Sequence, residues 1–234
     1  MYSRVLKRIA VTFTVIAVAI AMALPVMAHA DQGDRFLPQG SIDAKALIGP
    51  PPARDSADFK TQMEIVLWLQ HTRTPEQVAF AEKTLDLERF TPLISTSLVE
   101  VDGRLLKETL DGVINEVRMD YDALKGVFDE PRPFQVDERV KPVGDARPVA
   151  AYPSGHAIRA TVYGTLLSDI FPEHETEIMD LAKQIGFGRV IAGVHYPVDV
   201  IAGQKLGAAY AEVVAEQPAY MEAVGRITGT DSQS

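Results

Sequence analysis

The chain has 234 residues, a formal net charge of −9 and no cysteine. An acidic chain is a poor partner for nucleic acid or for an anionic lipid surface, so we expect it to bind neither. Without cysteine it can form no disulfide, no thiol nucleophile and no Cys-ligated metal site. The length suffices for one domain with a sizeable core.

The first thirty residues have the pattern of an export signal. Three cations precede an apolar run over residues 9–24, which Pro25 ends, and Ala28-His29-Ala30 has the small-x-small form of a cleavage site. We therefore expect a signal peptide over residues 1–30, cleaved after Ala30, and a periplasmic mature protein. A retained membrane anchor is the alternative, although the run is short for the ~20 residues that a span requires.

Removal of the signal would make the protein more acidic. The signal contains three cations and no anion, so 23 − 3 = 20 Lys and Arg would face 32 Asp and Glu, a net charge of −12. After residue 30 no apolar stretch of about 18 residues recurs. We expect a soluble mature protein with no stable membrane insertion, in which any cationic pocket is local and suited to a small anion.

The N-terminal third is expected to contain an arm and several helices. Residues 31–54 are rich in Pro and Gly and predict an irregular N-terminal arm. Asp55 and Ser56 can cap a helix with one continuous apolar stripe, formed by Phe59, Met63, Val66, Ile65, Leu67, Trp68 and Leu69. Thr74-Pro75 starts a second helix, and a less regular one is predicted over residues 88–98.

A long amphipathic helix is predicted from about Asp102 to Gly126. Its apolar residues repeat at intervals of three and four: Leu106, Leu110, Val113, Val117, Tyr121 and Leu124. Pro131 and Pro133 forbid its continuation. The proline-rich segment 131–153 is then a long loop, and long loops in compact domains are usually functional or disordered.

Three more helices complete the expected fold. They cover Ser154 to Ile170, Glu173 to Val194, and a stretch from Pro197 onward. The inward residues are predicted to be Ile178, Leu181 and Ile185 on the second, and Val198, Ile201, Ala202, Ala209 and Val213 on the third. A short helix over 218–227 and a polar tail over 228–234 follow. No strand pattern competes, so we predict one all-α domain over residues 55–227.

Ser154, Gly155 and His156 stand where a loop enters a helix. Serine is a good N-cap, and the free amides of the first turn form an anion site together with the helix dipole. Gly155 would let a ligand approach the backbone without a Cβ in the way. By itself this piece could equally be an ordinary capped helix that carries a surface histidine.

A second group comprises Arg189, His195 and Asp199. Pro197 disfavours helix at Tyr196, so His195 should lie at a helix break with Asp199 in the next first turn. The carboxylate can then orient the imidazole, whose other nitrogen becomes a base or nucleophile. Alone, His-x3-Asp also resembles an acyltransferase signature or a core histidine paired with an acid.

Lys125 and Arg132 form a third group, on either side of the helix break. Lysine offers a point charge, and arginine grips two oxygens in a fork. Singly, each could be a solvated cation at a helix end.

Lys-x6-Arg-Pro, Pro-Ser-Gly-His and Arg-x5-His-x3-Asp follow one another in this order. The combined pattern resembles the type 2 phosphatidic acid phosphatase superfamily, and within it the bacterial class A non-specific acid phosphatases. The lead-in from Pro50 to Ser56 is similar to that class as well. Gly188 departs from the pattern, since the family usually has serine before the arginine, which puts one phosphate contact in doubt.

The resemblance implies a helical bundle of the type 2 phosphatidic acid phosphatase and vanadium haloperoxidase kind, acting on small-molecule phosphate esters. It implies a His195 nucleophile that forms a phosphohistidine, an Asp199 that holds the ring, and a His156 that serves as acid and then base. The resemblance implies that the phosphoryl oxygens are held by Lys125, Arg132, Ser154, Gly155 and Arg189. Three cations would replace a metal, so the resemblance implies neither metal nor cofactor.

Several alternatives remain open at this point. A lipid phosphate or polyprenyl diphosphate is the nearest alternative substrate. A non-catalytic phosphate-binding module and an acyltransferase explain less of the pattern. Vanadium haloperoxidases share the same kind of pocket but are generally much larger. Relatives are often homo-oligomers, so the resemblance leaves a homo-oligomer open.

Overall fold

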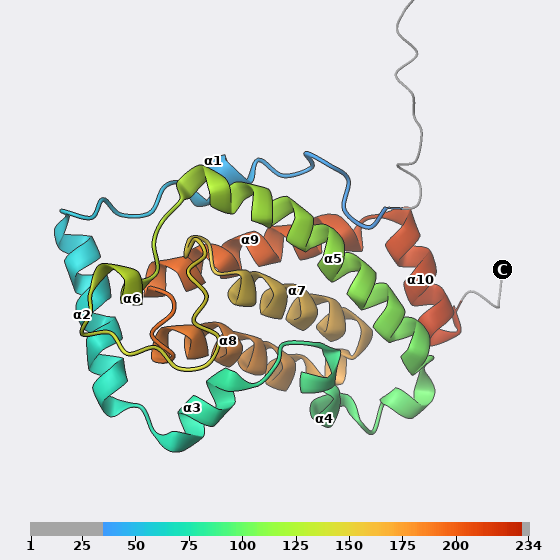
Figure 1. Ribbon diagram of the computed structural model, residues 1–234. Coiled ribbons are helices and arrows are strands. Elements are labelled where there is room, and N and C mark those ends of the chain that lie inside the picture. The colour runs from blue at the N-terminus through green and yellow to red at the C-terminus, as the bar shows by residue number, and fades with distance from the viewer. Residues whose placement is uncertain (1–34, 231–234) are drawn as a thin grey trace, which may run out of the picture. The chain divides into compact units, whose positions relative to one another are not determined.

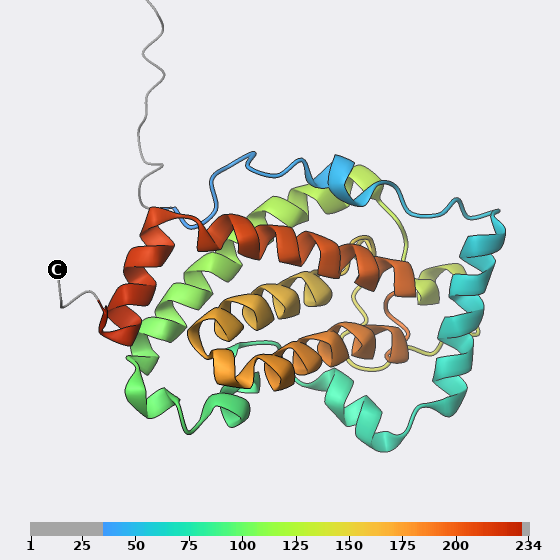
Figure 2. The ribbon, with the colours of Figure 1, turned by 180° about the vertical axis from the view of Figure 1, so that it is seen from behind.

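The computed structural model describes residues 35–230, which are helical and contain no strand (Figures 1 and 2). The predicted all-α fold is confirmed. The described residues belong to one compact unit, Gln32–Ser234. The expected signal peptide, the first residues of the expected arm and the end of the expected tail lie outside the described residues.

Four long helices form the bundle that carries the site: α5 (Gly103–Phe128), α7 (Gly155–Ile170), α8 (Glu175–Ile191) and α9 (Pro197–Ala215). Figures 1 and 2 both show α7 in the middle, with α8 and α9 beside it. Ten of the 16 residues of α7 are buried. A helix that is apolar on most of its circumference must be enclosed by neighbours, and α7 is therefore the central element of the core.

The two helices α7 and α9 pack closely because two glycines of α9 face the backbone of α7. A Cβ at Gly203 would lie 2.7 Å from the carbonyl oxygen of Ser154, and one at Gly207 would lie 2.6 Å from that of Ile158. Such distances exclude any side chain without a shift of one helix. The close contact brings the first turns of α7 and α9 to the same end of the bundle, where the Ser154 amide donates to the Asp199 carbonyl at 3.0 Å.

The other helices surround this bundle. The arm contains α1 (Ala44–Ile48), and α2 (Ala57–Thr72) and α3 (Pro75–Glu82) follow it, with α2 crossing one end of α8 and α9. The remaining short α-helices are α4 (Thr91–Ile94), α6 (Pro133–Val136) and α10 (Pro218–Thr228), the last of which packs against α5. The 3-10 turns are Leu87–Arg89, Leu98–Glu100 and Pro172–His174.

Several predicted boundaries were wrong. The arm is not wholly irregular, because Asp43 caps α1, and the loop 131–153 contains α6. The helix predicted over 88–98 is instead two 3-10 turns and α4. The α8 helix ends at Ile191 rather than Val194, because Gly193 adopts a φ of 75°. This left-handed conformation terminates helices and suits glycine.

Two predicted apolar faces were also partly wrong. Trp68 is 64% exposed, and Ile201 on α9 is 63% exposed. The buried side of α9 is the side that carries Gly203 and Gly207, because these glycines let the helix lie closest to α7. The large side chains on that side are Val200, Leu206, Tyr210 and Val214. Leu181 on α8 is half-buried rather than fully inward.

Candidate active site

A cavity of about 380 Å³ opens at the end of the bundle where α7 and α9 begin and α5 and α8 end. Six of the eight residues selected from the sequence line it: Lys125, Arg132, Gly155, His156, Arg189 and His195. Asp199 is buried behind His195, and Ser154 is fully buried beside the cavity. The bundle therefore brings the three sequence groups to one place.

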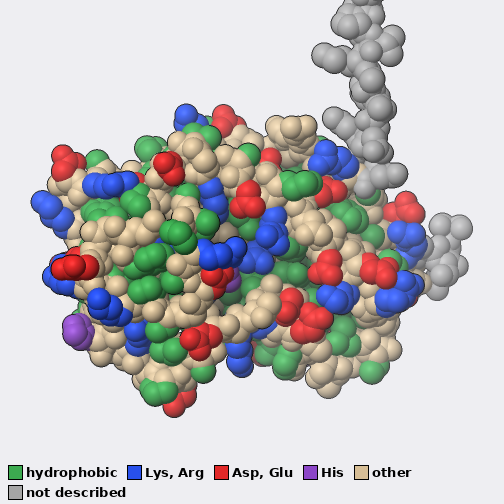
Figure 3. All heavy atoms as spheres, viewed as in Figure 1, with side chains coloured by type: hydrophobic (Ala, Val, Ile, Leu, Met, Phe, Trp, Pro, Cys, Tyr) green, Lys and Arg blue, Asp and Glu red, His purple; other side chains and the backbone are tan. Residues whose placement is uncertain are grey.

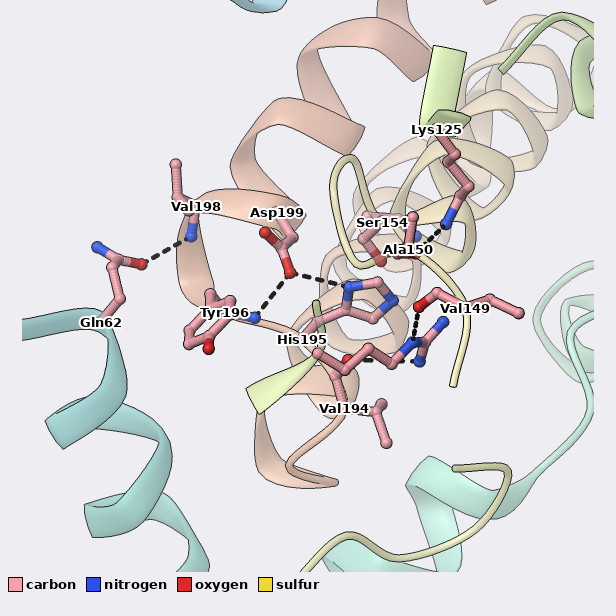
Figure 4. A network of polar contacts seen from close by, with 12 residues as sticks. Gln62, Lys125, Val149, Ala150, Ser154, Val194, His195, Tyr196, Val198 and Asp199 are labelled. Carbon is pink, nitrogen blue, oxygen red and sulfur yellow. Dashed lines mark hydrogen bonds and ion pairs between the residues drawn. The ribbon is translucent and has the colours of Figure 1, made fainter. Parts of the chain in front are cut away.

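His195 and Asp199 form a buried hydrogen-bonded pair (Figure 4). The imidazole Nδ1 lies 3.0 Å from Asp199 Oδ2, and the Tyr196 amide donates to the same oxygen at 2.9 Å. Pro197 at the start of α9 places Tyr196 in an extended conformation, and Asp199 falls at the third position of the helix. A carboxylate acceptor on Nδ1 selects the tautomer that leaves the Nε2 lone pair free.

Burial determines the charge state of this pair. The pKa of His195 lies well below its usual value because the ring is desolvated and because Arg132, Lys125 and Arg189 are near. The pKa of Asp199 is raised to about 7, chiefly by burial, against the opposing effect of the Tyr196 amide and the nearby cations. His195 is thus neutral, which is the state a nitrogen nucleophile requires.

The three predicted cations are held by backbone carbonyls. Lys125 Nζ donates to Ala150 at 3.1 Å, Arg132 Nε to Val149 at 3.0 Å, and Arg189 Nη1 to Ala81 at 3.0 Å. Arg132 Nη1 donates further to Val194 at 3.3 Å. Within residues 35–230 none of the three forms an ion pair with a carboxylate. Their charges are oriented but not neutralised.

The accumulated positive charge is visible in the pKa values. Burial and the Arg132 charge lower the pKa of Lys125 to about 8, and burial with Arg132 lowers that of Arg189 to about 10. Arg189 Nε is buried and has no hydrogen-bond partner among the described residues. A bound anion would relieve both the repulsion and the unsatisfied donor.

His156 occupies a more open position in the cavity, in the first turn of α7. It is half-buried, whereas His195 is 1% exposed. Desolvation lowers the pKa of His156 to about 2, and Arg189, Arg159 and Arg132 add to the effect. Burial and these cations therefore keep His156 unprotonated, and a bound dianion that offsets the cations would raise its proton affinity.

The structure changes the interpretation of Ser154 and Gly155. The Ser154 amide donates to the Asp199 carbonyl and its hydroxyl accepts from Ala157, so its backbone N–H is not free for phosphate as expected. Gly155 lines the cavity, but its missing side chain makes room for Tyr121. A Cβ there would lie 3.0 Å from the Tyr121 hydroxyl. The amides of the first turn that remain without an intrahelical acceptor belong to Gly155 and His156.

Gly188, the departure from the family pattern, lies on the side of α8 that faces α3. A Cβ there would be 3.7 Å from the Phe80 ring, an ordinary contact distance. Space does not require glycine at this position. At Gly186 the fit is tighter, since a Cβ there would lie 3.2 Å from Val200.

Several cavity residues were missed by the sequence analysis. Arg118, Tyr121 and Asp122 come from α5, Asp145 and Arg147 from the loop, and Arg159 from α7. The α5 residues lie one and two turns before Lys125, so helical spacing could have identified them. Arg159 lies one turn after His156 and could have been identified in the same way. No comparable pattern marks the loop residues.

The loop 131–153 is held in place by α2. Gln70 Nε2 donates to the Arg139 carbonyl at 3.0 Å, and Arg73 Nη2 donates to that of Lys141 at 2.9 Å. Val143 N donates to Ala192 O at 3.0 Å. These contacts anchor residues 139–143 of the loop, which also supplies the Val149 and Ala150 carbonyls that accept from Arg132 and Lys125.

Two further observations concern the described residues alone. No group of three or more His, Cys, Asp or Glu side chains in residues 35–230 is arranged to hold a metal ion. Over the same range, no helix combines the length and apolar character needed to traverse a bilayer.

Comparison with known proteins identifies the class. Residues 109–221 match the family described as the PAP2 superfamily, and this segment contains every predicted site residue from Lys125 to Asp199. Residues 109–221 therefore form a PAP2 superfamily domain. The solved structure of Aquifex aeolicus LpxE is similar in fold, with a TM-score of 0.55 and 23% identity over 71% of this chain and 99% of that one.

The similarity to particular relatives extends beyond the motifs. A non-specific acid phosphatase of Salmonella typhi is 24% identical over 204 residues, which cover 81% of this chain and 80% of the relative. A lipid A 1-phosphatase of Rhizobium johnstonii is 36% identical over 58 residues, about a quarter of each chain (25% and 24%). The expected resemblance to bacterial non-specific acid phosphatases is confirmed, and family and relatives together support a phosphoric monoester hydrolase.

Proposed function

We propose that the chain hydrolyses phosphate monoesters in two steps through a phosphohistidine at His195. The observation that carries the proposal is the buried imidazole held by Asp199, which opens onto a cavity lined by Lys125, Arg132 and Arg189. This arrangement pairs a nucleophile with the charges that a phosphoryl group requires. The similarity to the Salmonella typhi acid phosphatase over most of both chains supports the same activity.

In the first step, Nε2 of His195 attacks phosphorus, and the N–P bond forms as the P–O bond to the leaving alcohol breaks. Asp199 accepts from Nδ1 and stabilises the charge that develops on the ring. The three cations hold the phosphoryl oxygens as charge spreads over them. His156 transfers a proton to the leaving oxygen, and its protonation depends on the dianion that offsets the arginines.

In the second step, His156 accepts a proton from water, whose oxygen forms the new P–O bond while the N–P bond breaks. His195 then regains its neutral state and phosphate departs. In this mechanism the cations supply the charge stabilisation that a metal supplies elsewhere. We therefore propose that turnover needs no metal, so that activity should persist in EDTA.

The decisive experiment replaces His195 with alanine and measures hydrolysis of a chromogenic phosphate monoester. We expect His195→Ala to abolish turnover while circular dichroism and the melting temperature show an intact fold. Wild-type enzyme is mixed with an ester whose phosphate is radioactively labelled, and the reaction is quenched with base. This should trap labelled phosphohistidine, an acid-labile protein adduct that His195→Ala lacks. Full activity of His195→Ala would refute the proposal.

A lipid-linked phosphate is a second candidate substrate. The observation that favours it is the similarity of about a quarter of the chain to a lipid A 1-phosphatase. Assays of soluble esters beside detergent-dispersed lipid phosphates separate the two. A kcat/KM that is higher for the soluble ester supports the primary proposal.

We also propose that the protein is exported to the periplasm, on the strength of the signal pattern of residues 1–30. Mass spectrometry of protein recovered from the periplasmic fraction should give an N-terminus at Asp31. A protein that remains at full length in the cytoplasm would contradict this proposal.

A further inference from the structure

The cavity carries more positive charge than one phosphate requires. Besides the three predicted cations, it is lined by Arg118, Arg147 and Arg159, against two carboxylates, Asp122 and Asp145. A neighbouring hollow of about 300 Å³ has six lining residues in common with the cavity, His156 among them, and adds Lys83 and Glu82. In Figure 3, Lys and Arg side chains gather near the middle of the visible face, with a histidine between them. Because the whole chain has a net charge of −9, this local excess of cations indicates a binding site for an anionic ligand.

Arg118, Arg147 and Arg159 are the outer arginines of the cavity, and they differ in whether a carboxylate already neutralises their charge. Arg147 pairs with Asp145 at 2.8 Å. Within residues 35–230, neither Arg118 nor Arg159 forms an ion pair with a carboxylate. Arg159 Nε donates to the Gly155 carbonyl, at 3.3 Å. Arg118 and Arg159 are therefore the outer cations whose charge remains for a bound anion.

Helix geometry places these two arginines beside the reacting groups. Arg118 precedes Lys125 by two turns on α5, a rise of about 10 Å, and Arg159 follows His156 by about one turn, or about 5 Å, on α7. Both helices present these residues to the same cavity. An anion between Arg118 and Arg159 would thus lie one to two helical turns from the primary phosphate, on the side of His156.

We infer that Arg118 and Arg159 form a second anion subsite, which selects substrates whose leaving group carries a second phosphate. The inference rests on the proposed function, because it assigns the leaving group to the side of the proton donor His156. A directly linked diphosphate is too short to span this separation, so the fitting chemistry is two phosphates on different carbons of a sugar-sized group. Such a group can be a free sugar bisphosphate or the head group of a glycolipid.

The test compares kcat/KM for glucose 1,6-bisphosphate with the sum of the values for glucose 1-phosphate and glucose 6-phosphate. Two groups that are hydrolysed independently give a ratio of about one, whereas an added pair of charge-assisted contacts should raise the ratio to about tenfold or more. In Arg118→Gln/Arg159→Gln the ratio should return to about one. Arg104→Gln/Arg226→Gln removes the same charge from exposed positions outside the cavity and should keep the wild-type ratio.

A second variant guards against misfolding of the double mutant. Arg118 is exposed, so Arg118→Gln alone should fold normally and lose part of the preference. A parallel pair of assays uses a bisphosphorylated and a monophosphorylated glycolipid dispersed in detergent. A preference for the bisphosphorylated substrate in only one pair of assays supports the subsite. It also shows whether the second phosphate belongs to a lipid head group or to a free sugar.

The outcomes separate this inference from the proposed function. If wild-type protein hydrolyses glucose 6-phosphate but shows a ratio of about one or less in both pairs of assays, the subsite is refuted and the phosphatase assignment stands. A high ratio that survives in Arg118→Gln/Arg159→Gln refutes the subsite as well. If no ester is hydrolysed at all, the proposed function fails and the inference fails with it.

Discussion

Asp199 is the residue whose contacts most constrain the chemistry. It is fully buried, and its Oδ2 receives hydrogen bonds from His195 and from the Tyr196 amide, while Oδ1 has no partner among the described residues. A buried carboxylate with so few partners is costly to maintain. Its retention is consistent with a role on the imidazole, and the role can be tested by a nearly isosteric change.

Asp199→Asn should preserve the packing but remove the negative charge that stabilises the charge developing on the His195 ring. We expect kcat for a chromogenic phosphate ester to fall by roughly 10³–10⁴-fold, with a much smaller change in KM. Asp111→Asn, an exposed change on α5, is the matched control and should leave kcat unaltered. A loss of less than about tenfold in Asp199→Asn would remove Asp199 from the mechanism.

The depressed pKa of His156 predicts a pH dependence of stability. Its folded pKa of about 2 lies below the unfolded value of 6.5, so the unfolded state binds the proton more readily. The stability present above pH 6.5 is therefore lost as pH falls, by at most about 1.4 kcal/mol per pH unit for this group. Melting curves of wild type and His156→Gln from pH 8 to 5 measure this loss of stability.

The difference between wild type and His156→Gln isolates this residue from Asp199, whose raised pKa acts in the opposite direction. We expect His156→Gln to gain stability relative to wild type as pH falls below 6.5. A difference that does not change with pH would show that His156 has an ordinary pKa in the folded protein.

At the scale of elements, the contact between α7 and α9 determines where the two histidines lie. Gly203 and Gly207 let the helices approach until the Ser154 amide meets the Asp199 carbonyl. The site is thus built on two packed helices rather than on the loop alone. A side chain at either glycine should separate these helices.

Gly207→Ala should destabilise the protein by about 1–3 kcal/mol, because its Cβ would lie 2.6 Å from the Ile158 carbonyl oxygen. We expect kcat/KM to fall as well, since α7 carries His156. Chemical denaturation and the chromogenic assay provide the two measurements. Gly126→Ala on α5 is the control: nothing lies within 4 Å of its Cβ, and it should stabilise by about 0.5–1 kcal/mol.

Elements were easier to predict than their orientations. Serine and proline at helix starts, together with apolar spacing, located α2, α3, α5, α7 and α9. The same spacing misplaced Trp68 and Ile201, which are exposed. On α9 the apolar side chains are spread around the helix, and the two glycines decide which side is buried. A hydrophobic pattern contains no information about which neighbour approaches most closely.

At the scale of the whole molecule, an acidic chain contains a concentrated cationic cavity. Lys125, Arg132 and Arg189 are partly desolvated there, and each lowers the proton affinity of its neighbours. Their mutual repulsion opposes folding in the absence of an anion. Ligand binding and global stability are consequently linked in this protein.

Inorganic phosphate or vanadate should therefore raise the melting temperature. Binding to the folded state alone adds about 2.7 kcal/mol when the free ligand is at 100 times its Kd. Arg132→Ala should abolish most of the shift, whereas Arg104→Ala, a change at an exposed ion pair on α5, should retain it. The measurement is a thermal scan at increasing ligand concentration, and equal shifts in both variants would contradict a cationic phosphate site at Arg132.

The sequence by itself determined the helical class, the order of the long helices and the set of candidate site residues. These properties depend on local spacing and on residue chemistry, both of which are readable along the chain. Only the tertiary structure decided that the Ser154 amide is engaged by Asp199, that Gly155 accommodates Tyr121, and that Arg159 joins the cavity. Those facts depend on the approach of segments far apart in the chain, which close packing specifies and a linear pattern does not.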